Sequence, residues 1–461
     1  MKGHLYFIGI VGHAMRGLAL ATREMGYRVS GLDPGADEGT ATAWLAERKI
    51  PWKREFSPAD MDGVTAVIVT GAHATNEFPA IVEARKRHIP IKSSAQWFGE
   101  LTKKERVISV AGTHGKTTTT SFITWLLEAD GHHPDFLIGV RPFNFDSSVR
   151  LTGSDIAVVE GDEYRASMLE MKSKVQYYHP DVLVLTAVEH DHPDMYPDLE
   201  SVKNRFREVI SGLPRSGHLI VCAQSKIALE LAESADCPVT TYGLDDGDYQ
   251  ARDIAYHPTG IEMDVLIRGT VLGRLAAPLF GRHNVLNALA AVAAVSGEGL
   301  TFDQIIEGAA RFKGAYRRFN LLTKADDKIA VIDDYAHHPT EATAMIEAAK
   351  LHFPGRRVVV LYRPHTYSRT QALLPEYQRA FDRADVVYIT DIEGARETGQ
   401  EHTVSGNDIV KALKMPAQYM PDRPKLVELV KSESRAGDVV LCLTVSGHGQ
   451  IAEELAKTLN S

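Results

Sequence analysis

Short apolar runs alternate with longer amphipathic stretches along the whole chain. The apolar runs have the length of strands that are buried on both faces, and several end in Gly, Asp or Glu. They lie at 5–10, 27–32, 64–71, 89–94, 106–110, 154–160, 182–188, 329–334, 356–361, 384–390 and 438–443. Stretches such as 15–25 and 120–127 have the apolar spacing of helices packed on one side. This alternation predicts an α/β protein built on parallel sheets.

One strand and one helix of this pattern enclose a glycine-rich turn. After the strand at 106–110 comes Gly-Thr-His-Gly-Lys-Thr-Thr-Thr, and the helix follows directly. Glycines let backbone N–H groups approach phosphate oxygens, a helix N-terminus adds positive potential, and a Lys-Thr pair can serve phosphates and Mg²⁺. Val110 stands where the full P-loop pattern has its first Gly, so an ordinary turn with a solvent-facing Lys is the alternative. The residues expected at a nucleotide are Gly112, Thr113, Gly115, Lys116, Thr117 and Thr118.

The chain of 461 residues is too long for one hydrophobic core. A charged segment at Leu101–Glu105 and a hinge-like segment at Lys313–Phe319 separate three groups of strands. We therefore predict three domains. They are a Rossmann-like N-terminal domain at 1–105, a central P-loop domain at 106–313 and a C-terminal Rossmann-like α/β domain at 314–461.

Acidic and histidine residues follow two buried strands beside the predicted phosphate loop. Asp162 and Glu163 come after the strand at 154–160, and Glu189 to Asp194 come after the strand at 182–188. Because Mg²⁺ prefers hard oxygen ligands together with substrate phosphates, these strand ends predict a metal site. The predicted ligands are Thr117, Glu163 and His192. The alternative is that the acids only solvate surface loops.

The first third of the chain has a βαβ opening with polar residues where its strands end. Open α/β sheets bind ligands at the carboxyl ends of their strands, so a ligand site is expected at Gly9, Gly12, Asp33, Gly71 and Asn76. The glycines do not follow the G-x-G-x-x-G spacing of dinucleotide sites, and a purely structural βαβ unit is an equal alternative.

Two further groups of residues have candidate roles. Asn284 lies near the start of a helix rich in small apolar residues, where capping the helix is favoured over reading an adenine edge. Arg and His residues follow the strands of the last third, and they suit a substrate that bears a carboxylate, because Arg binds carboxylates in bidentate fashion. Solvated loop charges are the alternative for any one of these arginines.

Composition narrows the class of protein. The formal net charge of −9 argues against a general nucleic-acid or membrane-surface binder. Three scattered cysteines suggest neither a disulfide framework nor a zinc site. Neither a signal peptide nor an apolar stretch of membrane-spanning length is evident, so we expect a cytoplasmic protein without membrane contact.

Taken together, these motifs resemble those of the Mur ligases, the ATP-dependent amide-forming enzymes of peptidoglycan synthesis, over essentially the whole chain. The motifs are G-T-H-G-K-T-T-T from 112, D-E at 162, E-x-D-H from 189, G-x-H-N-x-x-N-A from 281, R-R-F from 317 and D-D-Y-A-H-H-P-T-E from 333. The resemblance implies that ATP phosphorylates a sugar-linked carboxylate and that an amine then attacks the acyl phosphate. It implies ATP and Mg²⁺ as cofactors and small-molecule substrates, and we expect a monomer or weak dimer.

The resemblance also implies roles for single residues. Lys116, Glu163 and His192 would be catalytic, and Asn284 would read adenine after all. Arg318 would contact the γ-phosphate and Asp334 the ATP near the hinge. The UDP-N-acetylmuramate site would comprise Gly9, Gly12, Met15, Asp33, Gly71 and Asn76. The incoming amino compound would meet His338, His365 and Arg369.

Two branches of the family compete. Segments 138–145, 148–151, 162–164, 172–178 and 446–451 resemble the branch that recycles the tripeptide L-Ala-γ-D-Glu-meso-diaminopimelate onto UDP-N-acetylmuramate. Segment 363–370 instead resembles the branch that adds L-alanine. We expect the tripeptide ligase, with the L-alanine ligase as the alternative. A nucleotide-controlled binding protein and a folate or polyglutamate ligase without a UDP-sugar domain are more remote alternatives.

Overall fold

The computed structural model describes residues 2–36, 39–71, 74–193, 195–324, 327–397, 402–445 and 449–460. These residues form two compact units. The first comprises Met1–Glu189, Glu200–Tyr249 and Ala288–Gly308, and the second comprises His190–Leu199, Gln250–Asn287 and Ala309–Ser461. Three sheets carry the fold. Of the segment 446–451 that entered the comparison of branches, residues 446–448 lie outside the described residues.

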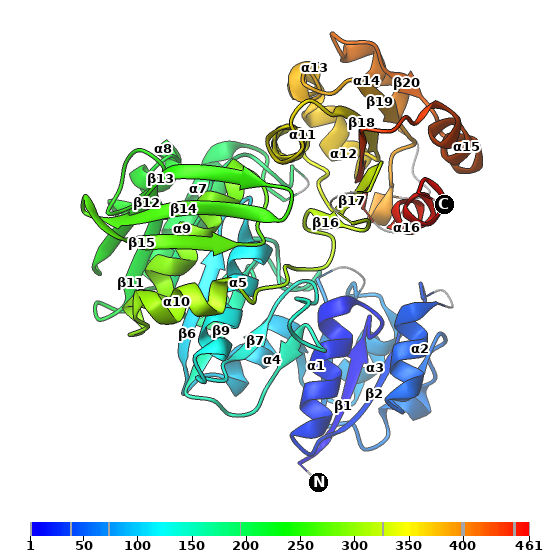
Figure 1. Ribbon diagram of the computed structural model, residues 1–461. Coiled ribbons are helices and arrows are strands. Elements are labelled where there is room, and N and C mark those ends of the chain that lie inside the picture. The colour runs from blue at the N-terminus through cyan, green and yellow to red at the C-terminus, as the bar shows by residue number, and fades with distance from the viewer. Residues whose placement is uncertain are drawn as a thin grey trace. The chain divides into compact units, whose positions relative to one another are not determined.

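The first sheet has five parallel strands in the order β3-β2-β1-β4-β5. The strands are β1 (His4–Ile8), β2 (Arg28–Leu32), β3 (Trp52–Lys53), β4 (Ala66–Val69) and β5 (Ile91–Ser93). The helices are α1 (His13–Glu24), α2 (Thr40–Glu47), α3 (Pro79–Lys86) and α4 (Ser94–Leu101), with a 3₁₀ turn at Pro58–Met61 (Figure 1). Every residue of β1 is buried, as expected for a parallel sheet covered on both faces. Leu5 and Phe7 pack into one apolar cluster, and Tyr6 and Ile8 pack into another.

The central sheet has ten strands in the order β15-β14-β13-β12-β11-β10-β6-β9-β7-β8. They are β6 (Arg106–Ala111), β7 (Asp135–Leu137), β8 (Val149–Arg150), β9 (Ile156–Gly161), β10 (Val182–Leu185), β11 (His218–Cys222), β12 (Val239–Gly243), β13 (Tyr249–His257), β14 (Gly260–Ile267) and β15 (Thr270–Ala277). The helices are α5 (Lys116–Ala129), α6 (Val175–Tyr178), α7 (Leu199–Ser211), α8 (Lys226–Ala232), α9 (Arg282–Gly297) and α10 (Phe302–Ala309). No prediction covered β13, β14 and β15.

The register of this sheet brings three strand ends together. Strand β6 pairs in parallel with β9 on one side and with β10 on the other. Its last residue, Ala111, lies opposite Gly161 of β9 and Leu185 of β10. The segments that follow these three strands therefore start side by side, and they include the predicted phosphate loop and the first acidic pair.

The first and central sheets share an apolar core within the first unit. One cluster contains Phe7 and Leu18 from the first sheet and α1 together with Val149 and Val159 from the central sheet. A Cβ at Gly17 of α1 would lie 2.9 Å from the Ser148 Oγ, so this glycine allows the helix to approach β8 closely.

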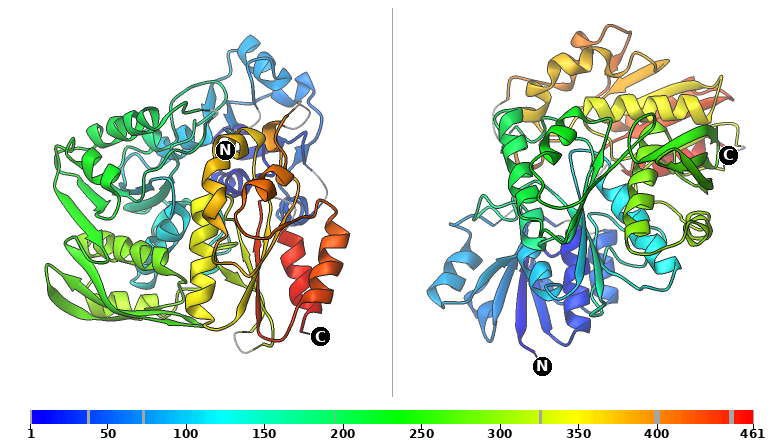
Figure 2. Two further views of the ribbon diagram at one scale, coloured as in Figure 1. Left: turned by 90° about the horizontal axis from the view of Figure 1, so that it is seen from above. Right: turned by 90° about the vertical axis from the view of Figure 1, so that its left-hand side faces the viewer.

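The third sheet has the order β16-β17-β21-β18-β19-β20 and is parallel except for its edge strand β16. The strands are β16 (Asn320–Leu321), β17 (Ala330–Asp334), β18 (Arg357–Tyr362), β19 (Val386–Ile389), β20 (Gln418–Tyr419) and β21 (Asp438–Leu443). The helices are α11 (Pro339–His352), α12 (Tyr367–Ala372), α13 (Leu374–Ala380), α14 (Gly406–Ala412), α15 (Arg423–Glu433) and α16 (Gly449–Thr458), with a 3₁₀ turn at Ala395–Glu397. Figure 2 shows the yellow helix α11 and the red helix α16 on opposite sides of these strands, where two separate apolar clusters lie.

The three-domain α/β architecture predicted from the sequence is confirmed, while the domain boundaries stay predictions. The first predicted boundary falls between the end of α4 at Leu101 and the start of β6 at Arg106. Within the described part of the chain, no helix combines the length and the apolar character needed to cross a bilayer.

A carboxyl pair lies where the chain passes from the first sheet to the central sheet. The carboxyl of Glu105 faces the fully buried carboxylate of Asp135, which accepts hydrogen bonds from the backbone N–H groups of Thr152 and Gly153. Burial, and next to it the charge of Asp135, raises the pKa of Glu105 from 4.5 to about 8. The folded protein therefore retains a proton that the unfolded chain releases.

Because of this pair, we predict that the free energy of unfolding falls as the pH rises. The stabilisation is complete below pH 4.5, the ordinary pKa of Glu105, and is lost as the pH rises to about 8. Because glutamine cannot ionise, Glu105→Gln should lose less stability over this interval. Calorimetry measures the Tm of Glu105→Gln and of the wild type at both pH values. The Tm of the variant minus that of the wild type should be about 2–4 °C larger at pH 9 than at pH 5. Glu55→Gln, at an exposed position, is the control. Parallel pH profiles for Glu105→Gln and the wild type would contradict the prediction.

Candidate active site

The predicted phosphate loop connects β6 to α5 in a backbone conformation that requires glycine. Gly112 has a φ of +124° and Gly115 a φ of +83°, which residues with a side chain rarely adopt. A Cβ at Gly112 would also lie 2.1 Å from the Oγ1 atom of Thr186 in the neighbouring strand segment. The two glycines therefore set the path of the loop.

Hydrogen bonds fasten this loop to the segment that follows β10. The N–H of Thr113 donates to the Ala187 carbonyl at 2.7 Å, and the Thr186 hydroxyl donates to the His114 carbonyl at 2.6 Å. The N–H of Glu189 donates to the Thr113 hydroxyl at 2.9 Å. These hydrogen bonds hold the loop in one conformation.

The side chain of Lys116 turns back onto the loop and does not face bulk water. Its Nζ donates to the Gly112 carbonyl at 2.6 Å and to the Glu163 carboxylate at 2.9 Å. Burial opposes the charge on this amine, but the carboxylates of Glu163, Asp162 and Glu160 outweigh it and raise the pKa of Lys116. The ammonium is therefore fully charged and lies beside the loop glycines, where a phosphate would approach.

Three carboxylates lie at the end of β9, and each has a defined partner. The Thr117 hydroxyl donates to Glu160 Oε1 at 2.9 Å, and Glu163 accepts from Lys116. Asp162 accepts from the Lys174 Nζ at 2.5 Å. Carboxylate and hydroxyl oxygens side by side form a donor set that suits Mg²⁺.

Sequence reasoning missed two members of this network, Glu160 and Lys174. Glu160 could have been found, because it is the one charged residue in the otherwise apolar strand Ile156–Gly161. Lys174 gives no comparable signal, because its role depends on a chain reversal that brings it back to Asp162.

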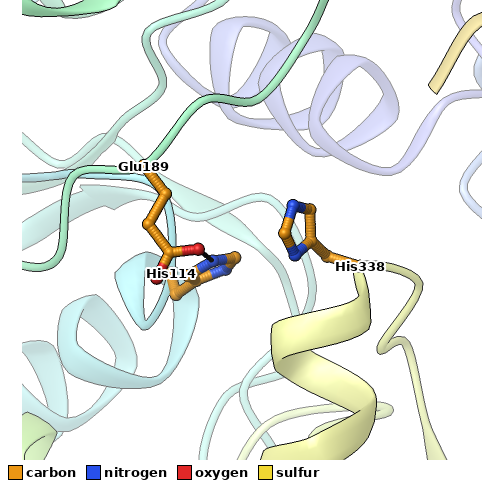
Figure 3. Close-up of side chains that lie close together, drawn as sticks. All are labelled: His114, Glu189 and His338. Atoms are coloured by element: carbon orange, nitrogen blue, oxygen red, sulfur yellow. Dashed lines mark hydrogen bonds and ion pairs between the residues drawn. The ribbon is translucent and has the colours of Figure 1, made fainter. Parts of the chain in front are cut away.

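The predicted second acidic cluster is divided between the two compact units. Glu189 belongs to the first unit, and its carboxylate lies 3.3 Å from the His114 Nε2. Figure 3 shows these two side chains side by side. Asp191 and His192 belong to the second unit, and Asp194 lies outside the described residues. The role of His192 as a metal ligand therefore stays a prediction.

In the second unit, Arg369 holds a cluster of the predicted residues together. Its Nε donates to Asp191 at 2.9 Å, and its Nη atoms lie 3.0 Å from the His365 Nδ1 and 3.3 Å from the His192 Nδ1. Arg369 is only 4% exposed. Burial opposes the charge on Asp191, but His192 and Arg369 hold the pKa of Asp191 well below its usual value. Arg369 and His365 lie together, and the guanidinium is bonded to protein groups, so their role at the incoming amine stays a prediction.

The remaining residues predicted at the ATP and at the incoming amine have structural partners as well. His338 precedes α11, and its Nδ1 accepts from the Thr340 N–H at 3.2 Å. Both oxygens of Asp334 accept backbone N–H groups, from Phe319 at 2.6 Å and from Ala336 at 2.7 Å. The Arg318 guanidinium lies 5.6 Å from the centre of the Tyr335 ring.

Asn284 does not cap its helix. It lies in the first turn of α9, where its Nδ2 donates to the Phe280 carbonyl at 2.7 Å and its Oδ1 accepts from the Asn287 Nδ2 at 2.8 Å. A cap would accept from a backbone N–H, so the capping interpretation is wrong. The adenine role of Asn284 stays a prediction.

The residues predicted at the sugar lie in part at one edge of the first sheet. The Gly9 N–H donates to the Leu32 carbonyl at 2.7 Å, and Asp33 accepts from the Val11 N–H at 3.0 Å, which joins the ends of β1 and β2. Gly12 directly precedes α1. Near the end of β4, a Cβ on Gly71 would lie 2.8 Å from the Arg165 carbonyl oxygen.

Two further residues predicted at the sugar, Met15 and Asn76, have protein surroundings of their own. The side chain of Met15 is 3% exposed and belongs to the apolar core. Asn76 accepts a hydrogen bond from Arg85 at 2.7 Å on the protein surface. The roles of both residues at the sugar stay predictions.

Comparison with known families covers most of the chain. Residues 4–106 match a model described as the catalytic domain of the Mur ligase family. Residues 110–295 match the Mur ligase middle domain, and residues 317–444 match the Mur ligase glutamate ligase domain.

Individual proteins match over the full length. A protein of Rubrobacter xylanophilus named UDP-N-acetylmuramate–L-alanine ligase is 36% identical over 100% of both chains. A crystal structure of UDP-N-acetylmuramate–alanine ligase from Thermotoga maritima covers 99% of both chains at a TM-score of 0.81 and 24% identity. A murein peptide ligase from Psychrobacter arcticus covers 100% of this chain and 99% of its own, at a TM-score of 0.74 and 25% identity.

The loop geometry predicts that Gly112→Ala disrupts the site. The new Cβ would meet Thr186 Oγ1 at 2.1 Å in a backbone conformation that alanine rarely adopts. We expect a loss of about 2 kcal/mol or more in the free energy of unfolding, measured by urea titration, together with weaker nucleotide binding. Gly35→Ala, where a Cβ would meet nothing within 4 Å, is the control. Wild-type stability and nucleotide affinity in Gly112→Ala would show that the loop is not constrained in this way.

Proposed function

The chain belongs to the Mur ligase family of ATP-dependent amide ligases, and from this premise we propose that it joins L-alanine to UDP-N-acetylmuramate. The observation that carries the proposal is similarity over the full length. Relatives named UDP-N-acetylmuramate–L-alanine ligase are 32–36% identical and cover 95–100% of this chain.

The expectation of a tripeptide acceptor is contradicted by these same relatives. That expectation gave most weight to segments such as 138–145 and 172–178, which lie around the central sheet. Both branches use the same nucleotide and the same sugar, so residues near those ligands discriminate poorly between acceptors. Segment 363–370, which follows β18 of the third sheet, resembled the alanine-adding branch and was the better guide.

The reaction that we propose has two steps. A carboxylate oxygen of the muramyl group attacks the γ-phosphorus of ATP, and ADP leaves. The nitrogen of L-alanine then attacks the carbonyl carbon of this acyl phosphate, inorganic phosphate leaves, and the nitrogen loses a proton. Negative charge accumulates on the phosphoryl group in the first step, and the charged Lys116 beside the loop glycines can stabilise it.

Magnesium fits the donor set at the end of β9. Thr117, Glu160 and Glu163 would supply oxygen ligands, with His192 as the further predicted ligand. When bound, the ion would neutralise phosphate charge. These residues hold the loop in place. When the Lys116 ammonium changes its partner from Glu163 to a phosphate, the Glu163 carboxylate would be free to bind the metal.

The remaining substrate contacts are part of the proposal. Asn284, Arg318 and Asp334 would serve ATP. The ends of β1, β2 and β4 would bind the sugar nucleotide, and the cluster around His365 and Arg369 would serve the amino acid. The domains responsible would be residues 1–105, 106–313 and 314–461.

The proposal predicts a preference between acceptors. With ATP, Mg²⁺ and UDP-N-acetylmuramate, kcat/KM for L-alanine should exceed that for L-Ala-γ-D-Glu-meso-diaminopimelate by at least about 100-fold, because a site shaped for one small amino acid excludes a tripeptide. Release of ADP and mass spectrometry of the product measure this. Omission of the sugar nucleotide is the control and should abolish ADP release. Equal or better use of the tripeptide would refute the proposed acceptor.

Replacement of the loop lysine tests the phosphate role. Lys116→Ala should lower kcat/KM for ATP by at least about 100-fold while the circular dichroism spectrum stays that of the wild type, because the charge beside the phosphates is lost. Lys226→Ala, at an exposed position in α8, is the matched control and should leave kcat/KM unchanged. Full activity in Lys116→Ala would remove the basis for placing the triphosphate at this loop.

A further inference from the structure

The side chain of Arg165 carries a positive charge that no carboxylate in the described part of the chain balances. Its Nε is buried and has no hydrogen-bond partner. One Nη donates to the Tyr164 hydroxyl at 3.4 Å, and the guanidinium lies 5.5 Å from the centre of the Tyr164 ring. Among the residues that the structure describes, no carboxylate lies within ion-pair distance of Arg165.

Two other arginines of this chain whose Nε is buried without a partner form ion pairs through another nitrogen. Arg205 pairs with Glu208 at 2.6 Å, and Arg363 pairs with Glu393 at 2.6 Å. A guanidinium has five N–H donors, and one long hydrogen bond with one aromatic ring restores only part of the hydration that it loses on burial. An anion bound to this guanidinium would restore the interactions that burial removes.

Arg165 also lies between the two predicted ligand sites of the first unit. It is two residues from Glu163, whose carboxylate contacts Lys116 of the phosphate loop. Its own carbonyl oxygen would lie 2.8 Å from a Cβ at Gly71, near the end of β4. One segment therefore connects the phosphate loop with the ligand edge of the first sheet.

Hydrogen bonds hold this segment in a fixed reversal. The Ala166 N–H donates to the Lys172 carbonyl at 2.8 Å. The ion pair of Asp162 with Lys174 at 2.5 Å joins the two ends of the reversal. Arg165 itself forms a β-bridge with Ser173. The guanidinium is thus attached to a preorganised backbone, which limits the entropy lost when it binds a ligand.

Part of the same segment lines a hollow that carries both basic and acidic side chains. Ser167 and Glu170 line a hollow of about 530 Å³ beside β5. Three basic side chains, Arg85, His88 and Lys92, line it as well, against the one acid Glu170. Lys92 pairs with Glu100, so Arg85 and His88 are the remaining basic side chains on this hollow.

We propose that Arg165 binds an anionic oxygen of the sugar nucleotide and positions it for the reaction at the phosphate loop. This inference rests on the proposed function, because UDP-N-acetylmuramate is taken as the substrate. Two groups of that substrate have the required chemistry, the diphosphate and the carboxylate. Sequence reasoning used Tyr164 only as a feature of a family branch and assigned no role to Arg165.

Calorimetric titration of the full chain tests the proposal with two sugar nucleotides. UDP-N-acetylmuramate carries both the diphosphate and the carboxylate, whereas UDP-N-acetylglucosamine carries only the diphosphate. Arg165→Met should weaken binding of UDP-N-acetylmuramate by about 10- to 100-fold, the effect of one lost charge-assisted hydrogen bond, and Arg165→Lys should fall between it and the wild type. Equal weakening for both nucleotides assigns the diphosphate, and weakening for the muramyl nucleotide alone assigns the carboxylate.

Two controls separate binding from structure. Arg215→Met removes an exposed arginine and should leave both affinities unchanged. The affinity of Arg165→Met for ATP should equal that of the wild type, and its Tm should be unchanged or higher, because the variant removes a buried donor without a partner. A lower Tm with an equal loss of ATP and sugar-nucleotide binding would overturn the proposal in favour of a structural role.

The outcomes also separate this inference from the proposed function. If the wild type binds UDP-N-acetylmuramate and Arg165→Met binds it equally well, the inference fails and the proposed function stands. If the wild type binds ATP but neither sugar nucleotide, both are overturned.

Discussion

The charge balance around Lys116 is the constraint on which the site depends. Three carboxylates, Glu160, Asp162 and Glu163, surround a loop whose expected ligand is itself strongly anionic. Without cations among them, these groups would repel each other and the ligand. Lys116 and Lys174 supply that charge, and each is held by a carboxylate at 2.9 Å or less. An incoming phosphate can replace Glu163 as the partner of Lys116, so the resting structure already contains the interactions that the ligand exchanges.

The strand order and register of the central sheet produce this arrangement. Strand β6 lies between β9 and β10, and the register places Ala111, Gly161 and Leu185 side by side. The segments that follow these three residues therefore start at one edge of the sheet, as in other open α/β sheets. The shared core of the first and central sheets then fixes the edge of one sheet against the loops of the other, so the segment around Arg165 can serve both.

The third sheet shows why the acceptor was harder to predict than the chemistry. The predicted phosphate loop is recognisable from a few consecutive residues, because its glycines, Lys116 and Thr117 follow one another in the sequence. The cluster around Arg369 is built from Asp191, His192 and His365, which lie on separate segments. In the proposed function this cluster serves the amino acid, so its shape and charge would set acceptor specificity, and short motifs from the central sheet carried no information about it.

The sequence by itself determined the α/β class, three sheets and the position of the glycine-rich loop, because strand and helix periodicity and positive-φ glycines are local properties. The alternation of Ile261, Met263 and Val265 with polar residues would also have revealed β14. Tertiary structure alone decided that Thr117 meets Glu160, 43 residues away, that Lys174 meets Asp162, and that Arg369 meets Asp191, 178 residues away. It also decided that the Asn284 side chain donates to the Phe280 carbonyl and does not cap its helix. Such contacts follow from strand order and register, which bring distant segments together and are not encoded in any local pattern.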